Sequence, residues 1–426
     1  MTAHVDSAPA RLVPTPTPTP TPTSTQPPPP GAILLLAAAA FASGLSLRLT
    51  DPLLPQLVAE FGITLAQASH VVTAFSVAYG LSQLLFGPLG DRYGKYRVVA
   101  WACGASALTA LLCGLTPGFD SLVGARLLAG ATAAAIIPLS MAWIGDVVPY
   151  EIRQPVIARF LVGQILGLST GVLVGGLAAD HLGRHLPFFA LAAIFAGLGL
   201  ALAALNKRLP ASATTSSTHA DGPLLRRMAR EFSAVLAKPW ARVVLLTVFF
   251  EGAALYGAFA FIATHLHRAF GLSLVAAGSV VMLFGLGGVF FAAMAQWLVT
   301  RLGEAGVAGW GGSLMALSLL AIAVGPAWWW ALPACFVLGL GFYMFHNTLQ
   351  TNATQMAPER RGAAVAAFAS AFFLGQSAGV ACAGFIVGWS GTRLVMALGA
   401  AGVLGLGLNF SRLRRASQRV TVAPAA

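Results

Sequence analysis

The sequence predicts an all-α integral membrane protein whose twelve transmembrane helices form two pseudo-symmetric six-helix bundles. The chain is 57% hydrophobic and only 9% charged, whereas roughly 25% of the residues in a soluble domain are charged. Its charge-free stretches reach the roughly 18 to 20 residues that cross a bilayer as a helix. Continuous runs of this length favour helices over β-barrel strands, which are about 10 residues long and alternate strictly. The second half of the chain also repeats the first, which divides the helices into two bundles.

The individual helices follow when the apolar runs are divided at charges and at Pro or Gly breaks. The predicted spans are 32–57, 68–89, 98–116, 121–145, 156–179, 187–206, 241–264, 274–300, 306–325, 328–352, 362–388 and 393–411. The remaining organisation is a disordered Pro/Thr-rich cytoplasmic tail at 1–31, bundles at 32–206 and 241–411, a cytoplasmic linker at 207–240 and a basic cytoplasmic tail at 412–426. The linker carries a basic amphipathic stretch, which predicts either a short helix on the membrane surface or a simple tether.

The basic residues predict the orientation of the chain. Most of the 25 Lys and Arg residues fall in the two tails and in loops on one side of a twelve-helix arrangement. Loops rich in Lys and Arg stay in the cytoplasm, so both termini are expected inside a bacterial plasma (inner) membrane. The net charge of +12 is therefore a topology signal, and we expect a lipid bilayer and no nucleic acid as the partner.

The two halves of the chain are related by a repeat. A shift of 209 residues places Phe61-Gly62 on Phe270-Gly271, and Gly130 on Gly339; a shift of 208 places Gly176 on Gly384. Parallel repeats of this kind occur in secondary carriers. Glycines at four-residue spacing let helices approach closely, which predicts these helix-packing positions: Gly130, Gly167, Gly171, Gly175, Gly176, Gly375 and Gly379.

The loop between the second and third spans reads Gly87-Pro88-Leu89-Gly90-Asp91-Arg92-Tyr93-Gly94-Lys95-Tyr96-Arg97. It closely resembles the signature loop of the major facilitator superfamily, and with the six-plus-six arrangement the resemblance covers residues 32–411. The resemblance implies the major facilitator fold and an alternating-access transporter, typically monomeric, with the proton-coupled drug and sugar efflux branch closest in look. In that family the loop locks the cytoplasmic side, so the predicted conformational latch is Gly87, Gly90, Asp91, Arg92, Gly94, Lys95, Arg97 and Asp146. Charge that only sets the topology is the alternative.

Charged side chains inside spans are expensive and usually functional, and three of them are the predicted proton-coupling residues. Glu251 lies ten residues into its span, where a carboxyl group can act as a proton carrier or as a structural, protonated acid. Arg126 matches a fourth-helix Arg-x-x-x-Gly pattern that the family associates with proton coupling, although it could instead reach the membrane surface. Asp51 precedes Pro52 and could cap a restarted helix or pair with Arg126.

The substrate candidates are polar or aromatic residues on spans that line the central cavity in the family: Arg48, Tyr256, Tyr343, His346, Asn347 and Gln350. The polar ones could instead satisfy the backbone at a helix break, and the aromatic ones could instead face lipid. His265 and His267 end the seventh span and are expected to be solvated. The four cysteines lie within spans without ligand spacing, so we expect packing roles for them and neither a metal nor a cofactor.

These features together predict proton-coupled export, by antiport, of a small organic molecule. No Walker-type nucleotide-binding segment is present, so the energy is expected from a proton gradient. Gly171-Val172 stands where family antiporters carry Gly-Pro, which leaves import by a symporter or uniporter open. A membrane enzyme or sensor is the other alternative, but the sequence offers no cluster of catalytic residues and no soluble domain, so we expect no enzyme.

Overall fold

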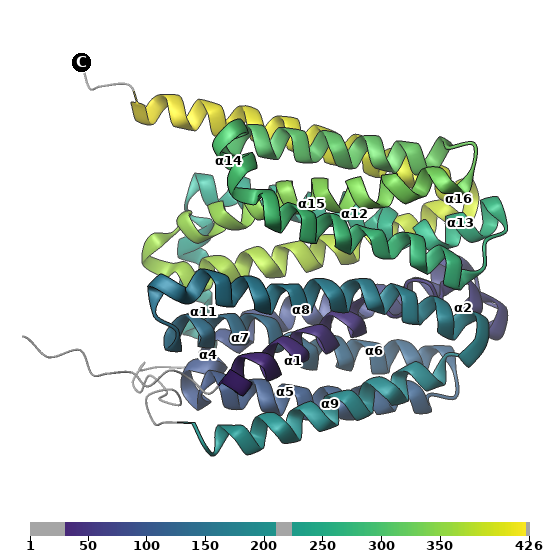
Figure 1. Cartoon of the computed structure of the whole chain (residues 1–426), viewed down its shortest axis with the longest axis horizontal. Coiled ribbons are helices and arrows are strands. Elements are labelled where there is room, and N and C mark those ends of the chain that lie inside the picture. The colour runs from purple at the N-terminus through teal and green to yellow at the C-terminus, as the bar shows by residue number, and fades with distance from the viewer. Residues whose placement is uncertain (1–29, 210–223, 423–426) are drawn as a thin grey trace, which may run out of the picture.

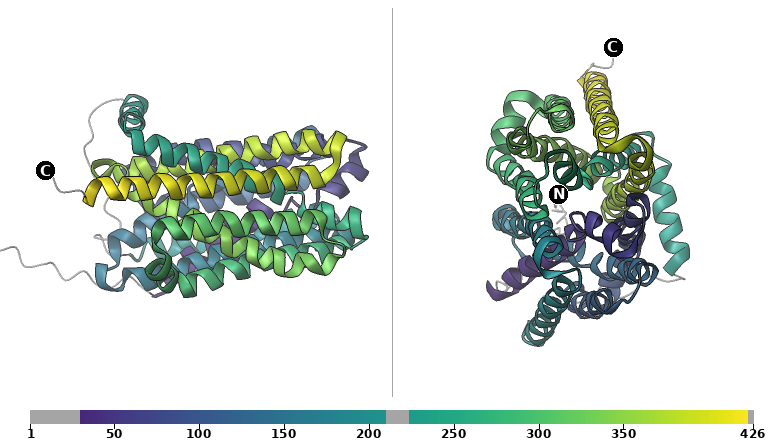
Figure 2. Two further views of the ribbon diagram at one scale, coloured as in Figure 1. Left: turned by 90° about the horizontal axis from the view of Figure 1, so that it is seen from above. Right: turned by 90° about the vertical axis from the view of Figure 1, so that its right-hand side faces the viewer.

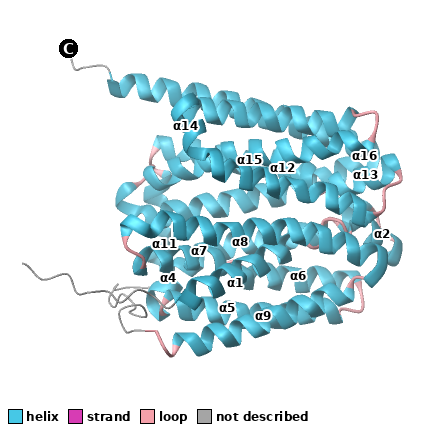
Figure 3. Cartoon of the chain, in the orientation of Figure 1, coloured by secondary structure: helices cyan, strands magenta, loops and turns pink. Residues whose placement is uncertain are grey.

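The structure is a computed structural model that describes residues 30–209 and 224–422, and these residues are helical almost throughout (Figures 1 and 3). The predicted tail at 1–31 lies almost entirely outside the described residues, as does the centre of the linker. The first half contains α1 (Pro30–Arg48), α2 (Leu54–Phe61), α3 (Leu65–Ala68), α4 (His70–Tyr93), α5 (Lys95–Leu115), α6 (Phe119–Ala133), α7 (Ile136–Val147), α8 (Tyr150–Leu177), η1 (Ala178–Leu182) and α9 (His185–Asn206). The second half contains α11 (Leu224–Leu236), α12 (Pro239–Phe259), α13 (Ile262–Phe270), α14 (Leu274–Val324), η2 (Trp328–Trp330), α15 (Ala331–Gln355), η3 (Pro358–Arg360) and α16 (Arg361–Val422).

The helices cross the membrane region twelve times, which confirms the predicted fold class. Within the described residues, 10 helical segments are long and apolar enough to span a bilayer. Two of them, α14 and α16, each contain a turn where the backbone leaves the helix, at Gly303 (φ 66°) and Gly391 (φ 78°). Each of these long segments therefore supplies two passes. Apolar side chains such as Leu200 and Val324, both 74% exposed, cover the outside, as a lipid solvent requires.

Several element boundaries differ from the predicted ones. The first span breaks after Arg48, and helix resumes at Leu54. The predicted capping role of Asp51 is wrong, because Leu53 holds the N-cap of α2 and no side chain caps it. The last helix continues to Val422 and does not end at residue 411.

The two halves share their internal packing, as the repeat predicts. A Cβ atom at Gly130 would overlap the carbonyl oxygen of Phe75, and one at Gly339 would overlap that of Phe284, its equivalent at the 209-residue offset. Other packing glycines make equivalent contacts at the 208-residue offset. Gly167 contacts Phe41 as Gly375 contacts Phe249. Gly171 contacts Leu45 as Gly379 contacts Ala253.

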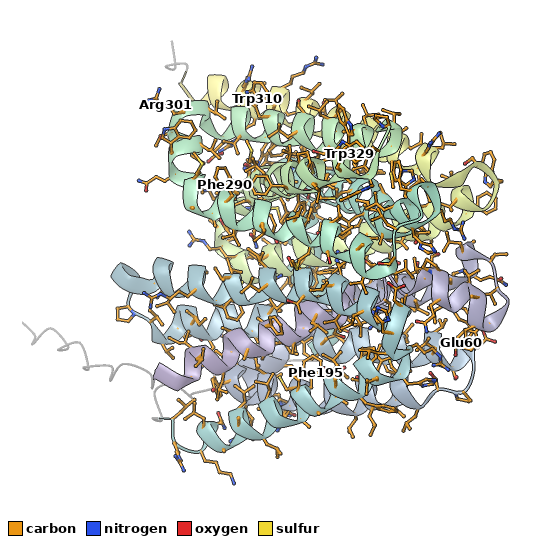
Figure 4. The ribbon with its side chains drawn as sticks, turned by 45° about the vertical axis from the view of Figure 1, so that its right-hand side comes forward. Glu60, Phe195, Phe290, Arg301, Trp310 and Trp329 are labelled. Atoms are coloured by element: carbon orange, nitrogen blue, oxygen red, sulfur yellow. The ribbon has the colours of Figure 1, made fainter. Side chains whose placement is uncertain are left out.

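The halves meet through two helix pairs, α4 with α16 and α8 with α14 (Figure 2, right). Gly176 packs on the backbone of Leu274, and Gly384 packs on Ala66 and Ser69, so the two contacts are themselves related by the repeat. Both lie at the end of the bundle that holds α2 and α13, opposite the ends of α1 and α16 at Pro30 and Val422 (Figure 1). Glu60 and Arg301 mark these two opposite ends in Figure 4.

Candidate functional site

The break in the first span exposes backbone carbonyls to the interior, and Arg126 binds there. Its Nη1 donates to the carbonyl oxygen of Ser46 (3.1 Å), its Nη2 to Thr50 Oγ1 (3.3 Å) and its Nε to the carbonyl oxygen of Val71 (3.4 Å). The last carbonyl groups of a helix lack hydrogen-bond donors within the helix, and the Arg126 guanidinium provides such donors here. Its central carbon also lies 4.1 Å from the centre of the Phe75 ring. Arg126 is 1% exposed and joins three helices, so it does not reach the membrane surface.

Asp51 pairs with Arg48 and not with Arg126. Arg48 Nη1 lies 3.4 Å from Asp51 Oδ2, and both side chains are 3% exposed. The other carboxyl oxygen of Asp51 is buried without a hydrogen-bond partner among the described residues. The expected ion pair with Arg126 is therefore replaced by one within the broken first span.

Arg48 also bridges the two halves. Its Nη2 donates to Gln376 Oε1 of α16 (3.1 Å), and Gln376 Nε2 donates to Ser76 Oγ of α4 (2.8 Å). Its guanidinium carbon lies 3.9 Å from the centre of the Tyr256 ring. Beside this contact is a cavity of about 10 Å³ lined by Arg48, Leu168, Ser169, Val172, Tyr256, Phe259, Val281 and Phe284.

Glu251 and His346 form a second polar pair inside the second half. His346 Nδ1 lies 2.9 Å from Glu251 Oε2; Glu251 is 0% exposed, and the His346 side chain is 17% exposed. Glu251 Oε1 is buried without a hydrogen-bond partner among the described residues. The imidazole ring packs on three phenyl rings, those of Phe342, Phe368 and Phe372.

Three other predicted substrate residues lie on α15, the helix of His346. Tyr343 is half-buried and packs against Phe284 and Phe342. Asn347 is exposed, and Gln350 is half-buried. The prediction that His265 is solvated is wrong: it is 2% exposed, and its ring nitrogens lie 2.8 Å from Thr392 Oγ1 and 3.1 Å from the carbonyl oxygen of Ile322.

The predicted latch contains an ion-pair cluster centred on Lys95. Its ammonium lies 2.6 Å from Asp146 Oδ2 and 3.8 Å from Asp91 Oδ1. Arg92 does not join these contacts and lies over the ring of Tyr93. The glycines shape the loop: Gly94 has a φ of 88°, and a Cβ atom at Gly90 would lie 2.6 Å from a methyl carbon of Leu139.

Asp180 is an inter-half contact that the sequence reasoning missed. Its Oδ2 accepts a hydrogen bond from the backbone N–H of Val275 (2.7 Å), in the first turn of α14. A carboxylate at a helix N-terminus satisfies a free donor and complements the helix dipole. The only sequence signal was an acidic residue at the end of the fifth span, which does not by itself indicate a backbone partner.

Two halves of six helices around enclosed charged groups define a multi-pass membrane transporter. Residues 36–379 match the family model of the Major Facilitator Superfamily, and the chain belongs to that superfamily. The predicted family is thereby confirmed at the level of the superfamily.

Individual relatives agree with this assignment. The chain is 26% identical over 358 residues to YceJ, an uncharacterized MFS-type transporter of Bacillus subtilis (strain 168), a match that covers 81% of this chain and 86% of YceJ. It is 28% identical over 141 residues to the multidrug export protein EmrB of Escherichia coli (strain K12), covering 33% of this chain but only 28% of EmrB. A crystal structure of the nucleoside transporter NupG shares the fold, with a TM-score of 0.73 at 16% identity over 90% of this chain and 99% of NupG.

Proposed function

We propose that this protein is a proton-coupled secondary transporter that exports a small organic molecule across the bacterial inner membrane by alternating access. The observation that carries the proposal is the Glu251–His346 pair. The carboxyl group is fully enclosed and has one bare oxygen, so it offers a place for a transported proton. The imidazole can pass a proton between its two nitrogens and is partly exposed, so it provides a route between Glu251 and water.

Alternating access is supported by the position of the contacts between the halves, which lie at one end of the molecule. The inter-half contacts of Gly176 and Gly384 close the end that holds α2 and α13. The Lys95 cluster lies at the opposite end and joins α4, α5 and α7 within the first half, so it does not itself hold the two halves together. With both termini in the cytoplasm, the described arrangement is closed toward the outside, and rocking of the halves would exchange the open and closed ends.

Export is supported by the similarity to EmrB, which is described as a multidrug export protein. The rival function is import by proton symport, which Val172 favours because family antiporters carry proline at this position. The two functions predict opposite movement of the substrate in cells with the same proton gradient.

The test uses everted membrane vesicles acidified inside by respiration, with a pH-sensitive dye that reports the gradient while compounds are added singly. We expect a transported compound to release protons in the wild type and in Glu304→Gln, a peripheral carboxylate paired with Arg414. Glu251→Gln should reduce this release at least tenfold, and His346→Asn should slow it. Full proton release by Glu251→Gln would exclude Glu251 as the proton site, while gradient-driven accumulation of the compound in intact cells would exclude export.

A further inference from the structure

We infer that the centre of the interface between the halves binds an organic anion, a carboxylate on an aromatic or other apolar body, with Arg48 as its anchor and Gln376 as the group that the carboxylate displaces. This inference rests on the proposed function, because it names the class of substrate. It draws on three observations: the position of Arg48, the charges around it and the groups that line the cavity beside it.

Arg48 lies on the pseudo-symmetry axis of the molecule. At the 208-residue offset it is equivalent to Tyr256, and the two side chains are in direct contact, at 3.9 Å from guanidinium carbon to ring centre. A residue can contact its own symmetry equivalent only next to the axis. In carriers built from two repeats, the axis is where a substrate contacts both halves. Leu168 and Gln376, also equivalent at this offset, flank the same contact.

The enclosed charges on the first-half side leave a positive excess. Arg48 and Arg126 are 2% and 1% exposed, and Asp51, at 2%, is the enclosed carboxylate beside them among the described residues; Glu251, 0% exposed, is enclosed on the second-half side. Arg126 has its donors committed to backbone and hydroxyl oxygens. Among the described residues, Arg48 donates from two of its three nitrogens, to Asp51 at 3.4 Å and to the neutral amide of Gln376 at 3.1 Å. A ligand carboxylate would accept two parallel N–H groups from the guanidinium, an arrangement stronger than the amide contact that it replaces.

Gln376 occupies the position that such a carboxylate would take. Its oxygen accepts from Arg48, while its nitrogen donates to Ser76, so an α16 side chain links two helices of the first half. Displacing the oxygen from Arg48 removes a direct hydrogen bond between the halves. Binding of an anion would therefore weaken the contact between the halves at the centre of their interface and favour the rocking motion.

The remaining lining residues select the body of the ligand. Besides Ser169, the neighbours of Arg48 in the cavity are aliphatic or aromatic, with the rings of Tyr256, Phe259 and Phe284 on the second-half side. The cavity of about 10 Å³ holds no more than about one water molecule in this arrangement. The ligand must therefore enter when the halves part, with its apolar body against the rings and its carboxylate on Arg48.

The test measures binding of three probes of matched shape to the purified full-length protein by isothermal titration calorimetry. The probes are 4-phenylbutyrate, 4-phenylbutan-1-ol and 4-phenylbutylamine. We expect the carboxylate to bind at least tenfold more tightly than the alcohol or the amine. Arg48→Gln should remove this preference, and Arg268→Gln, which changes an exposed arginine, should retain it. An amine or alcohol that binds as tightly as the carboxylate, or absence of carboxylate binding, would overturn the inference.

Gln376→Glu is a second test that keeps Arg48 in place. It supplies the anchor with a carboxylate of its own, so we expect at least tenfold weaker binding of 4-phenylbutyrate. Unchanged affinity would contradict the inference even if Arg48→Gln does not fold, which size-exclusion chromatography would show. The titration uses no proton gradient, so a result that contradicts the anion site would not contradict proton coupling through Glu251. Conversely, failure of the vesicle assay leaves the anion site standing.

Discussion

Arg126 and Glu251 are both enclosed in the membrane region, but their environments differ. Each of the three nitrogen atoms of the Arg126 guanidinium donates to an oxygen atom, and its face lies against Phe75. Glu251 keeps one oxygen without a partner among the described residues. A cation whose three nitrogens all donate across helices holds those helices together, whereas a carboxyl group with a bare oxygen, as in Glu251 and also in Asp51, can bind and release a proton. At the residue scale we therefore propose positioning as the role of Arg126 and keep Glu251 as the proposed proton carrier.

This assignment predicts that Arg126→Gln mainly destabilises the fold. The substitution leaves buried carbonyl oxygens without donors, which costs about 2 to 4 kcal/mol of unfolding free energy. Thermal unfolding in detergent would measure the loss, with Arg268→Gln, an exposed position, expected to change stability by no more than about 0.5 kcal/mol. A variant of Arg126 that keeps wild-type stability but loses proton coupling would show that the charge acts directly in coupling.

The site residues were only partly predictable from the sequence. Glu251 and His346 were each identifiable as polar residues inside spans, but their contact joins positions 95 residues apart. That contact depends on how α12 and α15 rotate about their axes, which a pattern of apolar residues does not specify. The Arg48–Gln376 bond joins residues 328 apart and depends on how the two halves dock. Asp180 was missed for a related reason, since its partner is a backbone N–H group.

At the scale of helices, glycines set the separation between the halves. Gly176 contacts the backbone of Leu274, and Gly278 contacts that of Val172, so α8 and α14 touch backbone to backbone. The repeat predicted Gly176 as a packing position, but not that its partner belongs to the other half. Repeat spacing identifies a small residue, while the docking of the halves decides what the residue contacts.

This contact predicts that Gly176→Val blocks the closed arrangement. The added side chain would overlap the Leu274 carbonyl oxygen, so the two helices could not close at this end. We expect transport in proteoliposomes to fall at least tenfold with normal amounts of protein in the membrane. Gly388→Val is the matched control, because no other helix among the described residues comes within 4 Å of a Cβ atom there. Equal transport by both variants would show that closure of this contact is not required.

The second inter-half contact can be trapped covalently. A Cβ atom at Gly384 would overlap Ser69 Oγ and lie 3.3 Å from the Cα atom of Ala66, so a disulfide between cysteines at positions 66 and 384 fits once the Ser69 hydroxyl group is removed. In a background with Ser69 replaced by alanine and the exposed Cys382 replaced by serine, we expect oxidation of Ala66→Cys/Gly384→Cys to stop transport and a reducing agent to restore it. Transport that continues at full rate in the cross-linked protein would refute alternating opening of this end.

At the scale of the whole molecule, the repeat explains the fold. The candidate site residues lie at positions where the two halves carry different residues. Equivalent glycines make equivalent contacts in both halves. Glu251, in contrast, corresponds to Ser43, Arg126 to Cys335 and Asp180 to Gly388 at the repeat offsets. The same packing contact can be made in each half by equivalent residues. A proton site and an anchor for one substrate are each needed only once in the molecule. The fold was therefore predictable from the sequence, because hydropathy and repeat spacing act along the chain, whereas the site had to be found where the halves differ.

The two proposals together predict the pH dependence of anion binding. An antiporter must not carry its proton and its substrate together, so each must weaken the binding of the other by the same factor. We expect the Kd of 4-phenylbutyrate to rise as the pH is lowered from about 8 to about 6, a range in which the probe stays ionised. Glu251→Gln, which can no longer exchange the proton at this position, should bind with a Kd that changes less over this range than the Kd of the wild type. Calorimetric titrations of both proteins at each pH would measure the slope. Simple attraction between an anion on Arg48 and a proton on Glu251 gives the opposite slope, so tighter binding at low pH would identify symport and overturn export by antiport.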